Sequence, residues 1–159
     1  MTAVSTDIAI EQLLAVIVEA FEGPKQGWSY FTDPGAESGL FGTLAGTNAS
    51  AASRVWGGTT IAAHAHHIRF SLAASAAWLS GDRAPQKWEE SWRVTTVDDA
   101  DWRSLQRELR SGYDALRQAI QAHAANDIES IGGAVAAVAH TAYHLGAIRQ
   151  KVAASRRDL

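Results

Sequence analysis

Two histidines, His140 and His144, stand four residues apart near the end of the chain. In an α-helix this spacing places both imidazoles on one face, about one turn apart. They could then bind one metal ion, with each nitrogen about 2.0–2.1 Å from it. Such a pair is also compatible with two partly buried polar residues bonded to backbone or water. The metal hypothesis therefore requires a third ligand from another element.

Three further histidines, His64, His66 and His67, fall within one predicted helix in the middle of the chain. At 100° per residue, His64 lies about 60° from the centre of that helix's apolar stripe and His67 about 120° from it, on the same side. His66 points nearly the opposite way, and we expect it to lie in water. Periodicity therefore leaves His64 and His67 both open as the third ligand, with His64 nearer the core.

A site of three histidines would leave coordination positions open for water or substrate, which is the catalytic rather than the structural arrangement for zinc. Imidazole also suits nickel, iron and copper, so the residues alone do not decide the metal. The chain has no cysteine, which excludes disulfides, a protein thiolate nucleophile and Cys-ligated zinc. This composition is compatible with the cytoplasmic location that we expect.

Composition and charge narrow the class of protein further. With 159 residues, 47% hydrophobic and 19% charged, the chain reads as a single domain, 1–159, with its own core. Its net charge is −3 and its Lys and Arg residues are scattered, so we expect no nucleic-acid partner. Glu11 and Glu19 interrupt the first apolar run, so we expect neither a signal peptide nor a membrane span.

Apolar residues that recur at steps of three and four predict four helices joined by two long connections, residues 23–58 and 82–97. The first connection is too apolar for a disordered linker, and we expect one short helix near Leu40 to Ser53. The fold class is therefore all-α, and a four-helix bundle would hold a metal or ligand site between facing helices. The predicted helices run from Asp7 to Phe21, from Thr59 or Thr60 to Ser80, from Thr95 or Thr96 to Ala124, and from Asp127 to Ala154. The expected N-caps are Thr6 or Asp7, Thr59 or Thr60, Thr95 or Thr96, and Asp127.

The last predicted helix has two different faces. Its bulky aliphatic stripe lies almost opposite His140 and His144, and the stripe must be covered by the first helix or by a second subunit. We therefore expect a homodimer. The face that carries the histidines has small residues that leave room for a ligand: Gly133, Ala136, Ala137 and Ala147.

Four of the six tryptophans, Trp28, Trp56, Trp88 and Trp92, lie in or beside the two connections. They could wall a pocket near the metal, or they could simply anchor the loops. The fifth, Trp102, is expected in the core.

The segment from His140 to Gln150, HTAYHLGAIRQ, resembles the last-helix signature of the DinB/YfiT-like superfamily of metal-dependent bacterial proteins, in which H-x-x-x-H-x-G-Q-I-R is usual. The segment HAHHIRF, which begins at His64, is similar to that family's earlier helix, where a His followed by an aliphatic residue supplies the third ligand. The resemblance therefore implies His67, followed by Ile68, as the ligand beside His140 and His144, with His64 as the alternative.

The resemblance extends from the first helix to Gln150 and includes Trp88-Glu-Glu-Ser-Trp92. One departure is Ala147, which stands where Gln is common, so a substrate contact from that side chain is missing. Arg149, which matches the signature's Arg, is expected to make a structural ion pair.

The resemblance implies a four-helix bundle of DinB/YfiT type with long loops after helices one and two. It also implies a metal-dependent enzyme with a divalent transition metal, zinc or nickel first and iron as a further candidate. Members of this superfamily include thiol-dependent transferases and a mycothiol-dependent isomerase. We therefore expect a thiol-dependent transferase or a related hydrolase, with a low-molecular-weight thiol as a small-molecule partner. The alternatives are a non-catalytic metal- or ligand-binding stress-response protein and a helical dimerisation domain that binds no metal.

Overall fold

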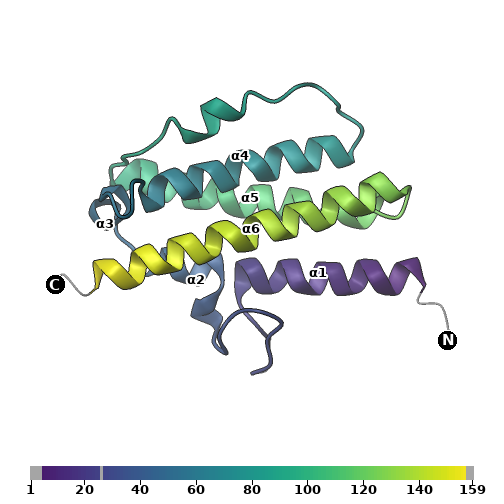
Figure 1. Ribbon diagram of the computed structural model, residues 1–159, viewed down its shortest axis with the longest axis horizontal. Helices are drawn as coiled ribbons and strands as arrows, with labels where there is room; N and C mark the ends of the chain where they lie inside the picture. Colours follow the sequence, from purple (N-terminus) through teal and green to yellow (C-terminus); the bar gives the residue numbers. More distant parts are fainter. Residues whose placement is uncertain (1–4, 26, 157–159) are drawn as a thin grey trace.

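The computed structural model describes residues 5–25 and 27–156, and these form an all-helical chain (Figure 1). In the described ranges the only extended pairing is an isolated bridge between Trp56 and Thr59. The predicted all-α class is thereby confirmed. The helices are α1 (Thr6–Glu22), η1 (Ala36–Ser38), α2 (Leu40–Ala45), α3 (Ala49–Ser53), α4 (Ile61–Leu79), η2 (Trp88–Trp92), α5 (Asp99–His123) and α6 (Ile128–Ser155), where η marks a 3₁₀-helix.

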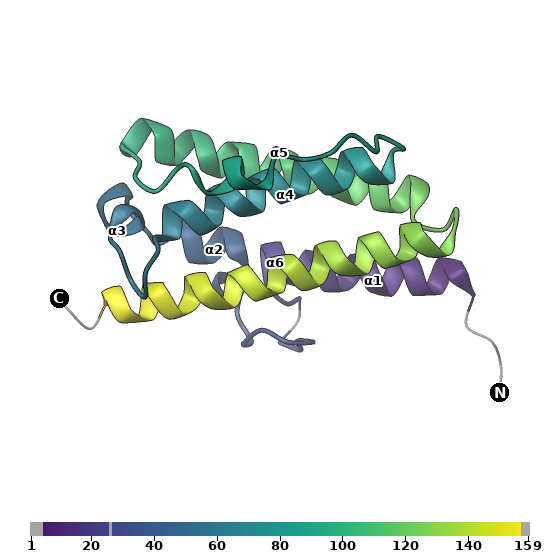
Figure 2. The same ribbon diagram turned by 45° about the horizontal axis from the view of Figure 1, so that its top comes forward.

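The four long helices lie side by side, as both views show (Figures 1 and 2). Helix α4 packs along both α5 and α6, and α1 packs along α6 and α5. The segment that contains η2 passes over the outer side of α4 and contacts it. Helices α4 and α6 are therefore neighbours, which is the condition for their histidines to meet.

The core is continuous through these helices. Phe21 of α1 contacts Phe41 of α2 and Tyr113 of α5, with ring centroids 5.4 and 4.7 Å apart. Burying side chains of this size stabilises the fold by about 1.5–3 kcal/mol each. Trp102 is 3% exposed, as predicted, and its indole N–H donates to the carbonyl of Thr47 at 2.7 Å. The largest fully buried side chains include Ile17, Phe21, Leu40, Ile68, Leu109, Leu116, Ile120, Leu145 and Ile148.

Two of the predicted helix starts are wrong by one to three residues. Helix α1 is capped by Ser5, whose hydroxyl accepts from the N–H of Ile8, and not by Thr6 or Asp7. Helix α5 is capped by Asp98, not by Thr95 or Thr96, because residues 93–97 are not helical and the Asp98 carboxylate accepts from the N–H of Asp101 at 2.8 Å. A carboxylate caps as well as or better than a threonine hydroxyl, so the later start is favoured.

The other two predicted caps are confirmed. The Thr60 hydroxyl accepts from the N–H of Ala63 at the start of α4. The Asp127 carboxylate accepts from the N–H of Ser130 at the start of α6.

The connection after α1 contains the 3₁₀-helix η1 and two short α-helices, α2 and α3, where the sequence predicted one short helix. Helix α2 ends at Ala45, and Asn48 begins α3 as its N-cap, with its side-chain oxygen accepting from the N–H of Ala51. The connection folds onto the bundle as expected, since Phe41 and Leu44 are buried. Gly39 permits this, because a Cβ there would lie 2.2 Å from the backbone nitrogen of Gly23.

Helix α6 is apolar, and its mean hydropathy reaches 1.2 over 18 residues. By length and composition alone it could cross a membrane, but the core helix of a folded domain passes the same test. Here α6 packs against α4, α1 and α2. Its aliphatic stripe is partly covered: Val138 and Leu145 are buried, whereas Ile128 is 85% and Val135 50% exposed.

Candidate metal centre

Three histidines meet between α4 and α6. Helix α4 carries His67, and α6 carries His140 and His144 one turn apart. The Nε2 atom of His140 lies 2.9 Å from that of His67 and 3.2 Å from that of His144. The structure thus brings together the three residues that the sequence proposed as ligands, and this group could hold a metal ion.

The spacing of these nitrogens fits a shared ion. Two imidazole nitrogens that are each about 2.0–2.1 Å from one ion lie about 2.9–3.4 Å apart in tetrahedral or octahedral geometry. The two measured Nε2 separations, 2.9 and 3.2 Å, fall within that range. The third pair, His67 and His144, has ligand nitrogens within 4.8 Å of each other.

The Nδ1 atom of His67 is held by a serine. It lies 2.6 Å from Oγ of Ser91, whose hydroxyl in turn donates to the carbonyl of Trp88 at 2.6 Å. Because that hydroxyl has one proton and gives it to Trp88, it accepts from His67, which must carry its proton on Nδ1. The Nε2 atom of His67 is therefore left with a lone pair that faces the other two histidines.

The remaining Nδ1 atoms also have outer partners. Nδ1 of His140 lies 3.0 Å from Oγ of Ser71, and Nδ1 of His144 lies 2.9 Å from Nδ1 of His64. Metal-binding histidines characteristically engage their second nitrogen in this way, because the bond fixes the orientation of the ring. His64, the alternative ligand, therefore contacts His144 on its outer side and lies outside the three-histidine group.

The rings of the cluster are neutral at ordinary pH. Burial is the largest cause and the neighbouring histidines are the second, and together they lower the pKa of His67 to about 4 and that of His144 to about 3. Burial also lowers the pKa of His140, and burial followed by the charge of Lys151 lowers the pKa of His64 to about 4. Neutral imidazole is the form that binds metals, so the rings do not have to lose the second proton of an imidazolium first.

Helix η2 forms an aromatic cover over the cluster. The indole of Trp92 stacks on His67, with centroids 4.1 Å apart and planes at 17°, and meets His144 edge-on at 5.7 Å. Trp88 lies 6.1 Å from His67. Two of the four loop tryptophans thus wall the site, whereas Trp28 packs against Tyr30 on the other connection.

His66 is not in water, contrary to the prediction from the helical wheel. It is half-buried, and its Nδ1 lies 2.7 Å from the carbonyl oxygen of Ser91. The reason is that η2 folds over the face of α4 that points away from the bundle. A wheel describes one helix and cannot include a loop that returns to cover it.

Sequence reasoning missed the two serines and Lys151. Ser71 follows His67 by one helical turn, which is a usable signal, but nothing in the spacing marks Ser91. Lys151 is buried in α6, and its ammonium donates to the carbonyls of Trp56 and Thr59. It therefore ties the start of α4 to α6, beside the cluster.

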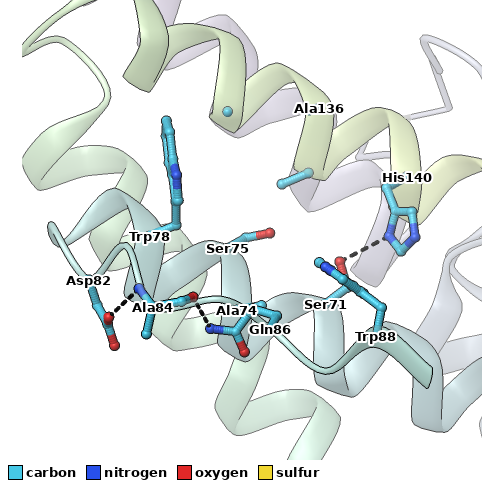
Figure 3. A pocket seen from close by; sticks show the side chains of 12 residues that line it. Ser71, Ala74, Ser75, Trp78, Asp82, Ala84, Gln86, Trp88, Ala136 and His140 are labelled. Carbon is cyan, nitrogen blue, oxygen red and sulfur yellow. Dashed lines mark hydrogen bonds between the residues drawn. The ribbon is translucent and has the colours of Figure 1, made fainter. Parts of the chain in front are cut away.

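A cavity of about 390 Å³ lies between α4 and α6 and reaches His140 at one end (Figure 3). Its volume is within the range of small-molecule sites. Of the small residues predicted to leave room on α6, Gly133, Ala136 and Ala137 line it, and Ala147 does not.

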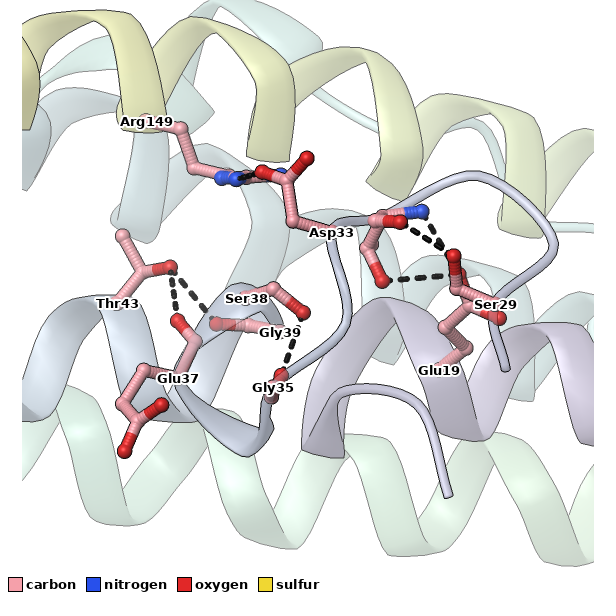
Figure 4. A network of polar contacts seen from close by, with 10 residues as sticks. Glu19, Ser29, Asp33, Gly35, Glu37, Ser38, Gly39, Thr43 and Arg149 are labelled. Atoms are coloured by element: carbon pink, nitrogen blue, oxygen red, sulfur yellow. Dashed lines mark hydrogen bonds and ion pairs between the residues drawn. The ribbon is translucent and has the colours of Figure 1, made fainter. Parts of the chain in front are cut away.

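A second buried polar cluster surrounds Glu19 of α1, where the first connection folds against that helix (Figure 4). The two carboxylate oxygens of Glu19 accept from the backbone N–H groups of Tyr30, Phe31 and Thr32 at 2.7–2.9 Å, and from the hydroxyl of Thr32. Nearby, Arg149 makes the expected ion pair, with Asp33.

Comparisons of the chain with protein-family models, with curated proteins and with solved structures gave no match.

Proposed function

We propose that the protein is a metal-dependent enzyme of the DinB/YfiT-like type, in which His67, His140 and His144 hold a divalent transition metal. The observation that carries this proposal is the orientation of the three rings: their Nε2 atoms converge while each Nδ1 atom is held by an outer partner. Imidazole ligands favour zinc or nickel, with iron as a further candidate.

The arrangement of the chain supports the same assignment. Four long helices, with long connections after α1 and α4, are compatible with a DinB/YfiT-type bundle. The two signature segments that resemble this family, beginning at His64 and at His140, contribute the residues of one cluster.

The reaction that we propose is transfer to or from a low-molecular-weight thiol, with hydrolysis as the related possibility. A divalent cation bound by the three rings would act as a Lewis acid that lowers the pKa of the incoming nucleophile. The chain has no cysteine, so the thiol must come from outside. The described residues of the cavity include one carboxylate, Asp82, which lies away from His140 and gives no general base beside it. A thiol has a pKa of about 8.5 and loses its proton far more readily than water, so it needs such a base less.

The test combines metal content with a thiol-consumption screen. Purified protein, loaded in turn with zinc, nickel or iron, is mixed with low-molecular-weight thiols and small electrophiles, and loss of free thiol is followed. We expect metal-dependent consumption that disappears in His140→Ala and His144→Ala. Bound metal without turnover of any thiol would contradict the transferase proposal and favour the non-catalytic metal-binding alternative. Absence of metal would contradict both.

We also propose that the protein forms a homodimer in the cytoplasm. Support for the dimer comes from apolar side chains at the start of α1 and α6, where Ile8 is 50%, Ile128 85% and Val135 50% exposed. Sedimentation of the wild type and of Val135→Glu tests this, and a monomeric wild type would contradict it.

A further inference from the structure

The cavity beside His140 has the form of a groove with an aromatic residue near each end (Figure 3). Trp78 stands at the end away from the histidines, and Trp88 lies near His140. Between them the walls are made of small residues from both helices: Ala74 and Ser75 of α4, and Gly133, Ala136 and Ala137 of α6. The space between the two tryptophans is therefore mostly apolar.

The far wall is fixed in place by its neighbours. A Cβ atom on Gly133 would lie 2.5 Å from Cζ3 of Trp78, so only glycine lets the indole close against α6. The Arg83 guanidinium lies 3.7 Å from the centre of the Trp78 ring and donates to the Trp78 carbonyl. At the near end, Trp88 packs against Phe70 with ring centroids 5.4 Å apart. Aromatic walls that are already ordered lose little entropy when a ligand binds.

The charges along the groove disfavour an ionic ligand. Among the described residues that line it there is no Lys or Arg, and the nearby Arg83 lies against the Trp78 ring and donates to the Trp78 carbonyl, so in the metal-free protein a carboxylate or phosphate would find no cation among the lining side chains. Asp82 is its only carboxylate, and this group is exposed and already accepts from the N–H of Ala84 at 2.9 Å. An exposed carboxylate attracts a cation weakly. Apolar groups with an aromatic face are the ligands that match these walls.

We propose that this groove binds an uncharged aromatic group of the substrate between Trp78 and Trp88, with the reacting end directed to His140. The direction of the substrate rests on the proposed metal centre. Binding of the aromatic group itself does not, because His144 is not part of the groove lining.

The first experiment compares three naphthalene probes that differ in charge. Isothermal titration of the full chain, freed of metal with a chelator, with 2-naphthalenemethanol, 2-naphthoate and 2-naphthylmethylammonium gives affinity and stoichiometry. We expect one neutral molecule per chain and affinities at least about tenfold weaker for both ions. No binding of the neutral probe, or equal binding of either ion, would overturn the inference.

The second experiment locates the probe with a matched pair of variants. Ala136 lines the groove, whereas Ala139 is an exposed alanine on the same helix that does not. Ala136→Phe should weaken 2-naphthalenemethanol binding at least about tenfold, and Ala139→Phe should leave it unchanged. Equal affinity in the two variants would place the probe elsewhere and overturn the inference.

A third variant separates this inference from the proposed function. His144→Ala should lose metal yet bind 2-naphthalenemethanol as the wild type does. If the wild type holds no metal but still binds the probe, the proposed function fails and the groove assignment stands. If metal is bound and the probe is not, the groove assignment fails alone.

Discussion

The two buried polar clusters of this protein use their polar atoms in opposite ways. Glu19 is an acceptor surrounded by donors: four hydrogen bonds from residues 30–32 reach its two oxygens, and the first connection is thereby tied to α1 (Figure 4). The histidine cluster instead directs ring nitrogens toward one another, with the Nε2 atom of His140 2.9 and 3.2 Å from two others. A carboxylate whose hydrogen bonds are all made holds a loop, whereas converging imidazole nitrogens suit a cation.

Burial also acts differently on the two clusters. Burial on its own would raise the pKa of Glu19. The hydrogen bonds from Tyr30, Phe31 and Thr32 together outweigh burial, so the net pKa lies below its ordinary value and the carboxylate stays charged. In the histidine cluster burial is the leading cause and lowers each pKa, so the rings stay neutral. One cluster is thus complete without a ligand, and the other is suited to receive one.

The largest expected effect follows from removing a ligand. His144→Ala and His140→Ala should each weaken binding of zinc or nickel by more than about a hundredfold, which exceeds the effect of losing an outer partner. Isothermal titration measures this. His123→Ala, a histidine at the end of α5 outside the cluster, serves as the control and should bind metal as the wild type does. Metal affinity that is unchanged in both ligand variants would remove the contrast between the clusters.

Glu19→Gln tests the other side of the comparison. One of the charge-assisted bonds would be replaced by a contact between two donors, so we expect a loss of about 2–4 kcal/mol in the free energy of unfolding, with unchanged metal affinity. Denaturant titration measures the loss. Glu11→Gln, an exposed change on the same helix, should stay within about 0.5 kcal/mol.

The loss in Glu19→Gln should also depend on pH. The folded pKa of Glu19 lies below its ordinary value of 4.5, so its contribution to stability is present above that pH. The contribution is lost as the pH falls through the folded pKa. The difference between wild type and variant should therefore be constant near neutrality and shrink in acid, and a difference that grows in acid would contradict the assigned role.

Removing an outer partner should have an intermediate effect. Ser91→Ala leaves His67 free to turn or to change tautomer, and we expect metal affinity to fall about tenfold to a hundredfold. Ser80→Ala removes an exposed serine that bonds only within its own helix, and titration should give the wild-type affinity. If both serine variants bind metal equally well, Ser91 does not orient the ring.

The smallest effect is expected at Arg149. Its ion pair with Asp33 is on the surface, with the two side chains 33% and 77% exposed. Arg149→Ala should therefore cost about 0–1 kcal/mol in unfolding free energy, less at high salt, and leave metal affinity unchanged. A large loss of metal in this variant would show that the arginine acts at the centre and not on the loop.

Local rules were enough to predict the all-α class and the long helices of the fold. Hydrophobic periodicity predicted which face of each long helix is buried. Thr60 and Asp127 could be predicted as N-caps because each side chain bonds only to the first turn of its own helix. The start of α5 was missed because residues 93–97 are not helical, and Val97 there donates its N–H to the hydroxyl of Ser53, a contact across 44 residues. Sequence spacing contains no information on such a contact.

The same limit applies to the site. The pair on α6 followed from a four-residue spacing, and the choice of His67 over His64 came from a family resemblance, not from the wheel, which favoured His64. The wheel was wrong for His66 because η2 covers that face. Ser91 reaches His67 from a different segment, so only the packing of η2 on α4 reveals it.

The most direct measurement is anomalous X-ray scattering from crystals of the protein grown with zinc or nickel and recorded at the absorption edge of the metal. A single strong peak within bonding distance of the Nε2 atoms of His67, His140 and His144, absent from crystals of His144→Ala, is the expected result. A peak elsewhere in the chain, or none at full metal loading, would contradict the three-histidine centre.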